Sequence, residues 1–176
     1  MKKVDYSISL KRIYTKAVPS TLLILAVGAL FYELVWHNLL SAIPSLWLRL
    51  YVFLPIILGL TVLHEITHIF GFWLLGKSGR QDWQIGIRSA TPYAHCSAPM
   101  TLRAYKAVVV LPGLLLGILP LLLAFIFGWP IVFVYSIIMT TAALGDFFIL
   151  LNLRGLSSHS LVVDHASKPG CWLILP

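Results

Sequence analysis

Four long apolar segments, separated by shorter polar ones, organise the sequence. They cover residues 18–36, 48–75, 107–127 and 131–151. Each segment is close to the roughly 20 apolar residues that an α-helix needs to cross a bilayer. The pattern therefore predicts an all-α membrane protein with four transmembrane helices.

The longest polar segment, Lys77–Lys106, lies between the second and third predicted helices. Within it, Trp83, Ile85 and Ile87 alternate with polar residues or glycine, which is typical of a half-buried strand. The residues that follow, 89–96, fit a turn and a returning strand. We expect a short β-hairpin or an ordered loop at the cytoplasmic face, and the pattern leaves both open.

Two further segments could form strands. If a strand forms at Trp83–Ile87, its edge is expected to bind an extended peptide substrate through backbone hydrogen bonds. The tail, Gly155–Pro176, contains two short apolar segments that fit strands or interfacial segments equally well. The sequence does not decide between these two forms of the tail.

Composition places the chain in the membrane class. Of its 176 residues, 59% are hydrophobic and 11% are charged, whereas soluble proteins have about 25% charged residues. Four helices occupy most of this length, so we expect one integral-membrane domain over residues 1–176 and no separate soluble module. The lipid bilayer is thus an expected partner.

The distribution of the 13 basic residues predicts the orientation. Basic residues cluster before the first helix, in Lys77–Lys106 and after the fourth helix, and only Arg49 lies near the opposite face. Such clusters stay in the cytoplasm, which gives a multi-pass protein with both termini cytoplasmic. Because the basic residues flank apolar segments, the net charge of +7 does not indicate nucleic-acid binding. The expected location is the plasma membrane of a prokaryote.

The second apolar segment contains the sequence His64-Glu65-Ile66-Thr67-His68, which matches the H-E-x-x-H pattern of zinc peptidases. Residues four apart share one face of a helix, so both imidazoles can reach one ion. The glutamate next to the first histidine can then act as the general base. His64 and His68 are therefore predicted metal ligands, and Glu65 is the predicted catalytic residue.

These three polar residues are unusual in their surroundings, because residues 50–75 contain no other charged or histidine residue. Ionisable groups inside a membrane helix are costly and mark functional sites. The alternative is a chance match, with both histidines hydrogen-bonded inside a helix bundle.

A catalytic zinc site needs three protein ligands and an open position. Asp146 lies in the fourth apolar segment at a depth close to that of the two histidines, so it is the predicted third ligand. The alternative for Asp146 is a structural hydrogen bond. Other candidates fall outside the apolar segments or, for Glu33, near the outer face. Cys96 and Cys171 are far apart and indicate neither a disulfide nor a cysteine zinc site.

An H-E-x-x-H sequence on a membrane helix with a later intramembrane aspartate resembles the site-2 protease class of intramembrane metalloproteases. More closely, the chain resembles the family of small membrane zincin peptidases. The similarity extends over about residues 50–170 and includes three shorter motifs. They are Pro92-Tyr93-Ala94-His95-Cys96, Gly145-Asp146 and Val163-Asp164-His165.

The resemblance implies zinc bound by His64, His68 and Asp146, with Glu65 assisting attack by water held at the metal. It also implies cleavage of a membrane-embedded or membrane-associated protein substrate. Two features depart from site-2 proteases: Asp146 is followed by Phe147 rather than glycine, and the chain contains no PDZ-like domain. His95 and Cys96 could line the site or belong to an ordinary loop.

Two other functions are compatible with the same residues. In a metal-binding or metal-transport protein, Glu65 would be a carboxylate on the ion pathway and no peptide would be cleaved. In a catalytically inactive relative, the protein would act as a membrane scaffold. The intact motif, with a general base beside a single site, favours the endopeptidase.

Overall fold

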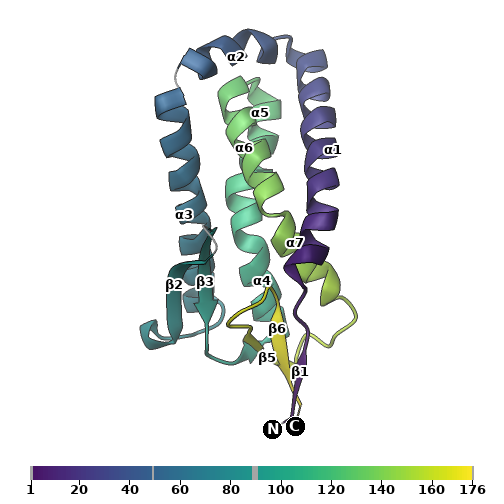
Figure 1. Cartoon of the computed structure of the whole chain (residues 1–176), viewed down its shortest axis with the longest axis vertical. Coiled ribbons are helices and arrows are strands. Elements are labelled where there is room, and N and C mark those ends of the chain that lie inside the picture. The colour runs from purple at the N-terminus through teal and green to yellow at the C-terminus, as the bar shows by residue number, and fades with distance from the viewer. Residues whose placement is uncertain (1, 49, 89–90, 176) are drawn as a thin grey trace.

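The computed structural model describes residues 2–48, 50–88 and 91–175, and Figure 1 shows long helices side by side with small sheets at one end. We call the end with both termini and the four-stranded sheet the sheet end. Four helical segments are long and apolar enough to cross a membrane within the described residues. They are α1 (Leu10–Trp36), α3 (Leu50–Leu74), α4–η2–α5 (Leu102–Phe127) and α6–α7 (Pro130–Asn152).

The first helix is longer than its apolar segment, since α1 begins at Leu10 rather than at Val18. Ser9 starts it, because its side chain accepts a hydrogen bond from the Arg12 amide, as an N-cap serine does. Lys11, Arg12 and Lys16 therefore lie on the exposed first turns of α1, whereas Lys2 and Lys3 precede the helix.

The connection between α1 and α3 is also helical. Helix α2 (Leu39–Leu48) begins where the Glu33 carboxylate accepts hydrogen bonds from the amides of Leu39 and Leu40, at 2.8 and 3.1 Å. The role of Glu33 is thus to cap α2, which satisfies backbone groups that a helix start leaves unpaired. Arg49, used above to predict the orientation, lies outside the described residues.

The third and fourth helices each change geometry near their middle. Helix α4 (Leu102–Pro112) is followed by the π-helical segment η2 (Gly113–Ile118) and by α5 (Leu119–Phe127). Helix α6 (Pro130–Ala142) stops at Ala143, and α7 (Leu144–Asn152) continues from there. The break at Ala143 was not predicted, because no proline lies near it.

The predicted four long helices are present, but the described residues also form two small antiparallel sheets, so the fold is mostly helical rather than all-α. One has the strand order β1–β6–β5–β4 and joins both ends of the chain. Its strands are β1 (Lys3–Asp5), β4 (Met100–Thr101), β5 (Leu161–Asp164) and β6 (Cys171–Ile174). Lys3 pairs with Ile174, so the two termini lie together in Figure 1. The tail segments are therefore strands.

The predicted hairpin is present as β2 (Trp83–Arg88) and β3 (Thr91–Cys96), which follow the short helix η1 (Arg80–Asp82). Its expected turn includes residues 89–90, which lie outside the described residues. Strand β3 contacts α3, whereas Ile85 and Ile87 of β2 are 58% and 77% exposed. The expectation of a half-buried strand is wrong for these two residues, because most of each side chain is exposed.

Candidate metal centre

Two histidines of α3 and one aspartate of α7 converge at one point. His64 Nε2 lies 3.1 Å from Asp146 Oδ2, and His68 Nε2 lies 3.6 Å from the same oxygen. One ligand atom from each residue lies within 4.8 Å of the others. The structure therefore brings together all three residues predicted to bind the metal.

These separations fit one small metal ion. Two ligand atoms that are each about 2.0–2.1 Å from a tetrahedral zinc ion lie about 3.3 Å apart. The separations of 3.1 and 3.6 Å to Asp146 Oδ2 are close to this value. Two imidazole nitrogens and one carboxylate form a donor set that suits zinc. The three residues could thus hold a zinc ion with a further position left for water or substrate.

The backbone of α3 explains the positions of three of the four predicted residues. His64 and His68 are one turn apart on the same face, and their rings lie 5.0 Å apart. Glu65 follows His64 and is therefore displaced around the helix, where its carboxylate meets the backbone amide of Ala94 in β3. Glu65 and His68 are partly buried, whereas His64 is buried.

Asp146 lies in the first turn of α7, directly after the break at Ala143. The first turn of a helix carries unpaired amides and a partial positive charge, which stabilise a carboxylate. The break therefore creates a favourable position for an aspartate in the middle of an apolar segment. Ala143 itself is fully buried.

A hydrogen bond at the second ring nitrogen orients His68. Its Nδ1 lies 3.2 Å from the carbonyl oxygen of Val108 in α4. That carbonyl is available because residue 112 is a proline, which has no N–H to complete the usual helical hydrogen bond. When Nδ1–H donates to Val108, the lone pair of Nε2 points toward the metal position. Such a second hydrogen bond fixes the tautomer of a metal-binding histidine.

A cavity of about 660 Å³ opens beside these residues. Glu65, His68 and Asp146 line it together with β3, whereas residues 83–87 of β2 do not. Strand β3 lies between them and the cavity. The expectation that the Trp83–Ile87 strand binds the substrate stays a prediction. The opposite wall is an apolar face of α1 made of residues spaced by four. They are Leu10, Tyr14, Val18 and Leu22.

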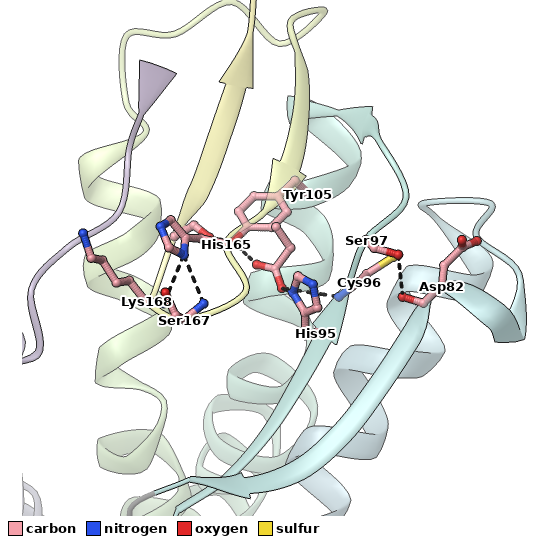
Figure 2. A network of polar contacts seen from close by, with 10 residues as sticks. Asp82, His95, Cys96, Ser97, Tyr105, His165, Ser167 and Lys168 are labelled. Atoms are coloured by element: carbon pink, nitrogen blue, oxygen red, sulfur yellow. Dashed lines mark hydrogen bonds and ion pairs between the residues drawn. The ribbon is translucent and has the colours of Figure 1, made fainter. Parts of the chain in front are cut away.

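The same cavity contains a second polar cluster that the sequence only hinted at. His95 of β3, Tyr105 of α4 and Asp164 of β5 meet there. Figure 2 shows His95 and Tyr105 coming together from different elements. His95 and Asp164 both occur in motifs that carry the family resemblance, which was the available signal. Tyr105 had no signal, because it lies in the polar segment Lys77–Lys106 outside the motifs that carry the resemblance.

Other polar residues have structural partners. His165 Nδ1 accepts hydrogen bonds from the amides of Ser167 and Lys168, both at 3.1 Å, as Figure 2 shows. Its ring stacks on Trp172 at 4.8 Å. Cys96 and Cys171 are free and buried, and burial raises the pKa of both thiols, that of Cys171 to about 12. These residues order the sheet end of the molecule.

Comparison with known proteins identifies one match for the chain. No curated protein and no solved structure matches it. A family model described as "Putative zincin peptidase" matches residues 57–161, and this segment contains His64, Glu65, His68 and Asp146. Because the match covers more than half of the 176 residues, the chain belongs to this zincin peptidase family.

Proposed function

We propose that the protein is a zinc-dependent endopeptidase that cleaves membrane-associated peptides within the membrane, as site-2 proteases do. The observation that carries the proposal is the convergence of His64, His68 and Asp146 beside Glu65 in one cavity. Membership of a zincin peptidase family supports the peptidase activity. The four apolar helices support an intramembrane position for the site.

In this mechanism His64, His68 and Asp146 hold the metal, and Glu65 is the general base. A bound zinc ion supplies Lewis-acid chemistry, which polarises a carbonyl group and makes water more acidic. Glu65 takes a proton from the attacking water and delivers it to the leaving amine nitrogen. The amide of Ala94 meets the Glu65 carboxylate and restrains its position before substrate binds.

The cavity walls indicate an apolar peptide as substrate. The face of α1 that lines the cavity is apolar, and its residues Leu10, Tyr14, Val18 and Leu22 are 52–64% exposed. On the other side, β3 presents backbone groups from Pro92 to His95. A substrate segment must be extended at the cleavage site, because a helix keeps its carbonyl groups hydrogen-bonded. The space between α1 and β3 suits such an extended apolar segment.

The proposed orientation places the sheet end in the cytoplasm. Basic residues gather there, including Arg12, Lys16 and Arg154 around one groove, and cytoplasmic segments carry an excess of such residues. A single cysteine introduced at Ser41 should then react with an impermeant reagent from outside the cell, and one at Ser157 should not. Reaction of both from the same side would contradict the orientation.

The substitution Glu65→Gln tests the mechanism. It keeps the size of the side chain but removes the base, so zinc content should stay unchanged. Cleavage of an apolar peptide by the purified protein should fall by about 10²–10⁴-fold, the usual contribution of a general base. His159→Gln, which changes an exposed histidine, is a control that should keep full activity.

The result also separates the peptidase from a metal transporter. A transporter would cleave no peptide in its native form, and Glu65→Gln would alter metal uptake into vesicles instead. Undiminished cleavage by the Glu65→Gln protein would contradict the proposed mechanism even with zinc present.

A further inference from the structure

A second groove, of about 370 Å³, lies where the start of α1 meets the end of α7. The two helices contact each other, and Figure 1 shows α7 beside the lower part of α1. The Asn152 side chain donates a hydrogen bond of 3.0 Å to the Tyr6 carbonyl, which ties the segment before α1 to the last residue of α7. A direct contact therefore holds the two walls of this groove together.

Three basic residues line the groove from its two walls, and we call it the basic groove. Arg12 and Lys16 are four residues apart and share one face of α1, whereas Arg154 follows the end of α7. None of the described acidic residues lines the groove. An arginine side chain does not lose its proton in a protein. The groove therefore carries a fixed positive charge at any physiological pH.

The chain supplies no carboxylate to neutralise this charge. It contains six Asp and Glu residues, and each of them has its hydrogen-bond partners at another place. These pairs are Asp5 with Ser7, Glu33 with Leu39, Glu65 with Ala94, Asp82 with Gly79, Asp146 with His64 and Asp164 with Tyr105. Among the ion pairs formed by the described residues, none includes Arg12, Lys16 or Arg154. Because like charges that share a groove repel each other, an anion from outside the chain would be stabilised there.

The basic groove lies at the depth of lipid headgroups in the proposed orientation. Lys16 and Trp36 are twenty residues apart on α1, which is about 30 Å at 1.5 Å per residue. A bilayer's hydrocarbon core has about the same thickness. With Trp36 at the outer interface, where tryptophan is enriched, Lys16 reaches the inner interface and Arg12 extends beyond it. The phosphates of the cytoplasmic leaflet lie at this level.

Apolar side chains form the rest of the basic groove. Ile8 and Ile13 are buried, and Phe148 and Leu151 of α7 line the opposite wall. Leu151 is 56% exposed, so the apolar wall continues onto the outside of the helix. Inorganic phosphate gains nothing from apolar contacts, whereas a phospholipid carries acyl chains next to its phosphate. The combination of fixed positive charge and apolar wall therefore favours a lipid.

We propose that the basic groove binds the phosphate of an anionic phospholipid from the cytoplasmic leaflet. Arg12 and Arg154 donate charge-assisted hydrogen bonds to the phosphate oxygens, for which the planar guanidinium is suited, and Lys16 adds a third positive charge. Basic pockets between membrane helices on the cytoplasmic side bind headgroups of this kind. The inference rests on the proposed membrane position and orientation, and it is independent of peptidase activity.

A lipid bound here would join two elements of the candidate metal centre. Ile13 of α1 lines both the basic groove and the cavity beside the candidate ligands, and α7 carries Asp146. A ligand that binds only the folded state stabilises that state by mass action. The lipid should therefore stabilise the packing of α1 against α7.

The test measures lipid binding to the purified full chain in detergent by native mass spectrometry, with phosphatidylglycerol and phosphatidylcholine at equal concentrations. The parent protein should retain phosphatidylglycerol in preference to phosphatidylcholine. Arg12→Gln and Arg154→Gln should each weaken this binding by at least about tenfold, the usual effect of losing a hydrogen bond to a charged group. Lys11→Gln is the matched control, because Lys11 is exposed on the same turn of α1 but does not line the groove.

Thermal unfolding gives an independent measurement of the same binding. Without lipid, all variants should keep the midpoint of the parent, because the changed residues are exposed. Phosphatidylglycerol at a hundredfold excess over its dissociation constant should raise the midpoint of the parent and of Lys11→Gln by at least about 5 °C. At the same lipid concentration, the midpoint of the double variant Arg12→Gln/Arg154→Gln should rise by about 1 °C.

Three outcomes would overturn the inference. The first is equal retention of the two lipids by the parent protein. The second is an equal loss of binding in Lys11→Gln and Arg12→Gln, which would indicate diffuse attraction to an anionic surface rather than a groove. The third is displacement of the lipid by inorganic phosphate at the same concentration, which would indicate a soluble ligand. None of these measurements uses peptide cleavage, so the peptidase function is tested separately by Glu65→Gln.

Discussion

Gly71 of α3 lies directly against Val108 of α4. A Cβ atom at position 71 would lie 3.2 Å from Val108 Cγ1 and 3.3 Å from Val108 Cα. A side chain at position 71 would press on Val108, so the glycine favours the close approach of the two helices. The approach brings the Val108 carbonyl within reach of His68, one turn away on α3. The position of a proposed metal ligand therefore depends on a small residue that does not touch the site.

Substitution Gly71→Ala should separate α3 from α4. We expect a loss of stability of about 1–3 kcal/mol, as for other overpacked sites. Zinc affinity should fall by about 10–100-fold, because the hydrogen bond that orients His68 is lost. Thermal unfolding and zinc titration with a chelator measure the two effects.

Gly59→Ala is the matched control on the same helix, since nothing lies within 4 Å of a Cβ atom at this position. It should keep full zinc affinity. Equal zinc affinity for Gly71→Ala and Gly59→Ala would contradict the proposed link between helix packing and the metal centre.

Asp146→Ala should lower zinc content as much as His68→Ala does, because both residues are proposed to share one ion. We expect each to lower zinc affinity by at least about tenfold, the smallest usual effect of even an outer-shell change. Glu33→Ala removes another carboxylate from an apolar helix, but one that caps α2, so zinc should be retained. The measurement is the zinc content of the three folded variants, determined by elemental analysis. Full zinc content in Asp146→Ala would remove this residue from the ligand set.

Substrate pairing should take place at the edge of β3 and not at that of β2. Ile85 and Ala94 are opposite each other in the hairpin, and the Ala94 amide points away from β2 toward Glu65. In such a pair both residues direct their backbone groups outward, on opposite edges. Ala94→Pro therefore removes a donor from the cavity edge, and Ile85→Pro removes one from the far edge.

We expect Ala94→Pro to impair peptide cleavage by at least about tenfold, the equivalent of one hydrogen bond of about 1.5 kcal/mol. The variant removes a donor at the cavity edge that also restrains the Glu65 carboxylate. Ile85→Pro should change cleavage little, and both proteins should retain zinc. Initial rates with the apolar peptide test this difference. If the two variants lost the same activity, the hairpin would be acting as a unit and not through one edge.

Cys96 and Cys171 should be unreactive in the folded protein. The thiolate is the reactive form, and burial raises the pKa of both thiols, that of Cys171 to about 12. Below these values the protonated thiol dominates, so alkylation by iodoacetamide should be slow at pH 7 and should accelerate as the pH rises. Unfolding in detergent should make both react rapidly. A cysteine introduced at the exposed Ser157 is the control, and fast labelling of the native pair at pH 7 would contradict their burial.

The sequence predicted the features that depend on periodicity. The four apolar segments correspond to the four long helices. The four-residue spacing of His64 and His68 predicted that both lie on one face of α3. Asp146 could be found because a carboxylate inside an apolar helix needs a partner. These arguments use local spacing and depth, which the chain encodes directly.

Features that depend on distant pairing could not be predicted. Strand β1 has three residues and one apolar side chain, Val4, and its partner β6 lies at the other end of the chain. The start of α2 depends on the Glu33 carboxylate reaching across the preceding turn. The hydrogen bonds of Tyr105 join α4 to β5, which are more than fifty residues apart in the chain. Such contacts have no local signature.

The hydrogen bond between His68 and Val108 has a consequence for how this family can vary. Pro112 leaves the Val108 carbonyl without its helical hydrogen bond, and His68 donates to that carbonyl. Replacing Pro112 would therefore weaken the hydrogen bond of His68, and replacing His68 would leave the carbonyl without this donor. The two positions should therefore be inherited together, and chains that lose the histidine should also lose the constraint that keeps the proline. A proline that looks like a defect in an apolar helix is, by this reasoning, under the same selection as the proposed metal ligand that its free carbonyl partner orients.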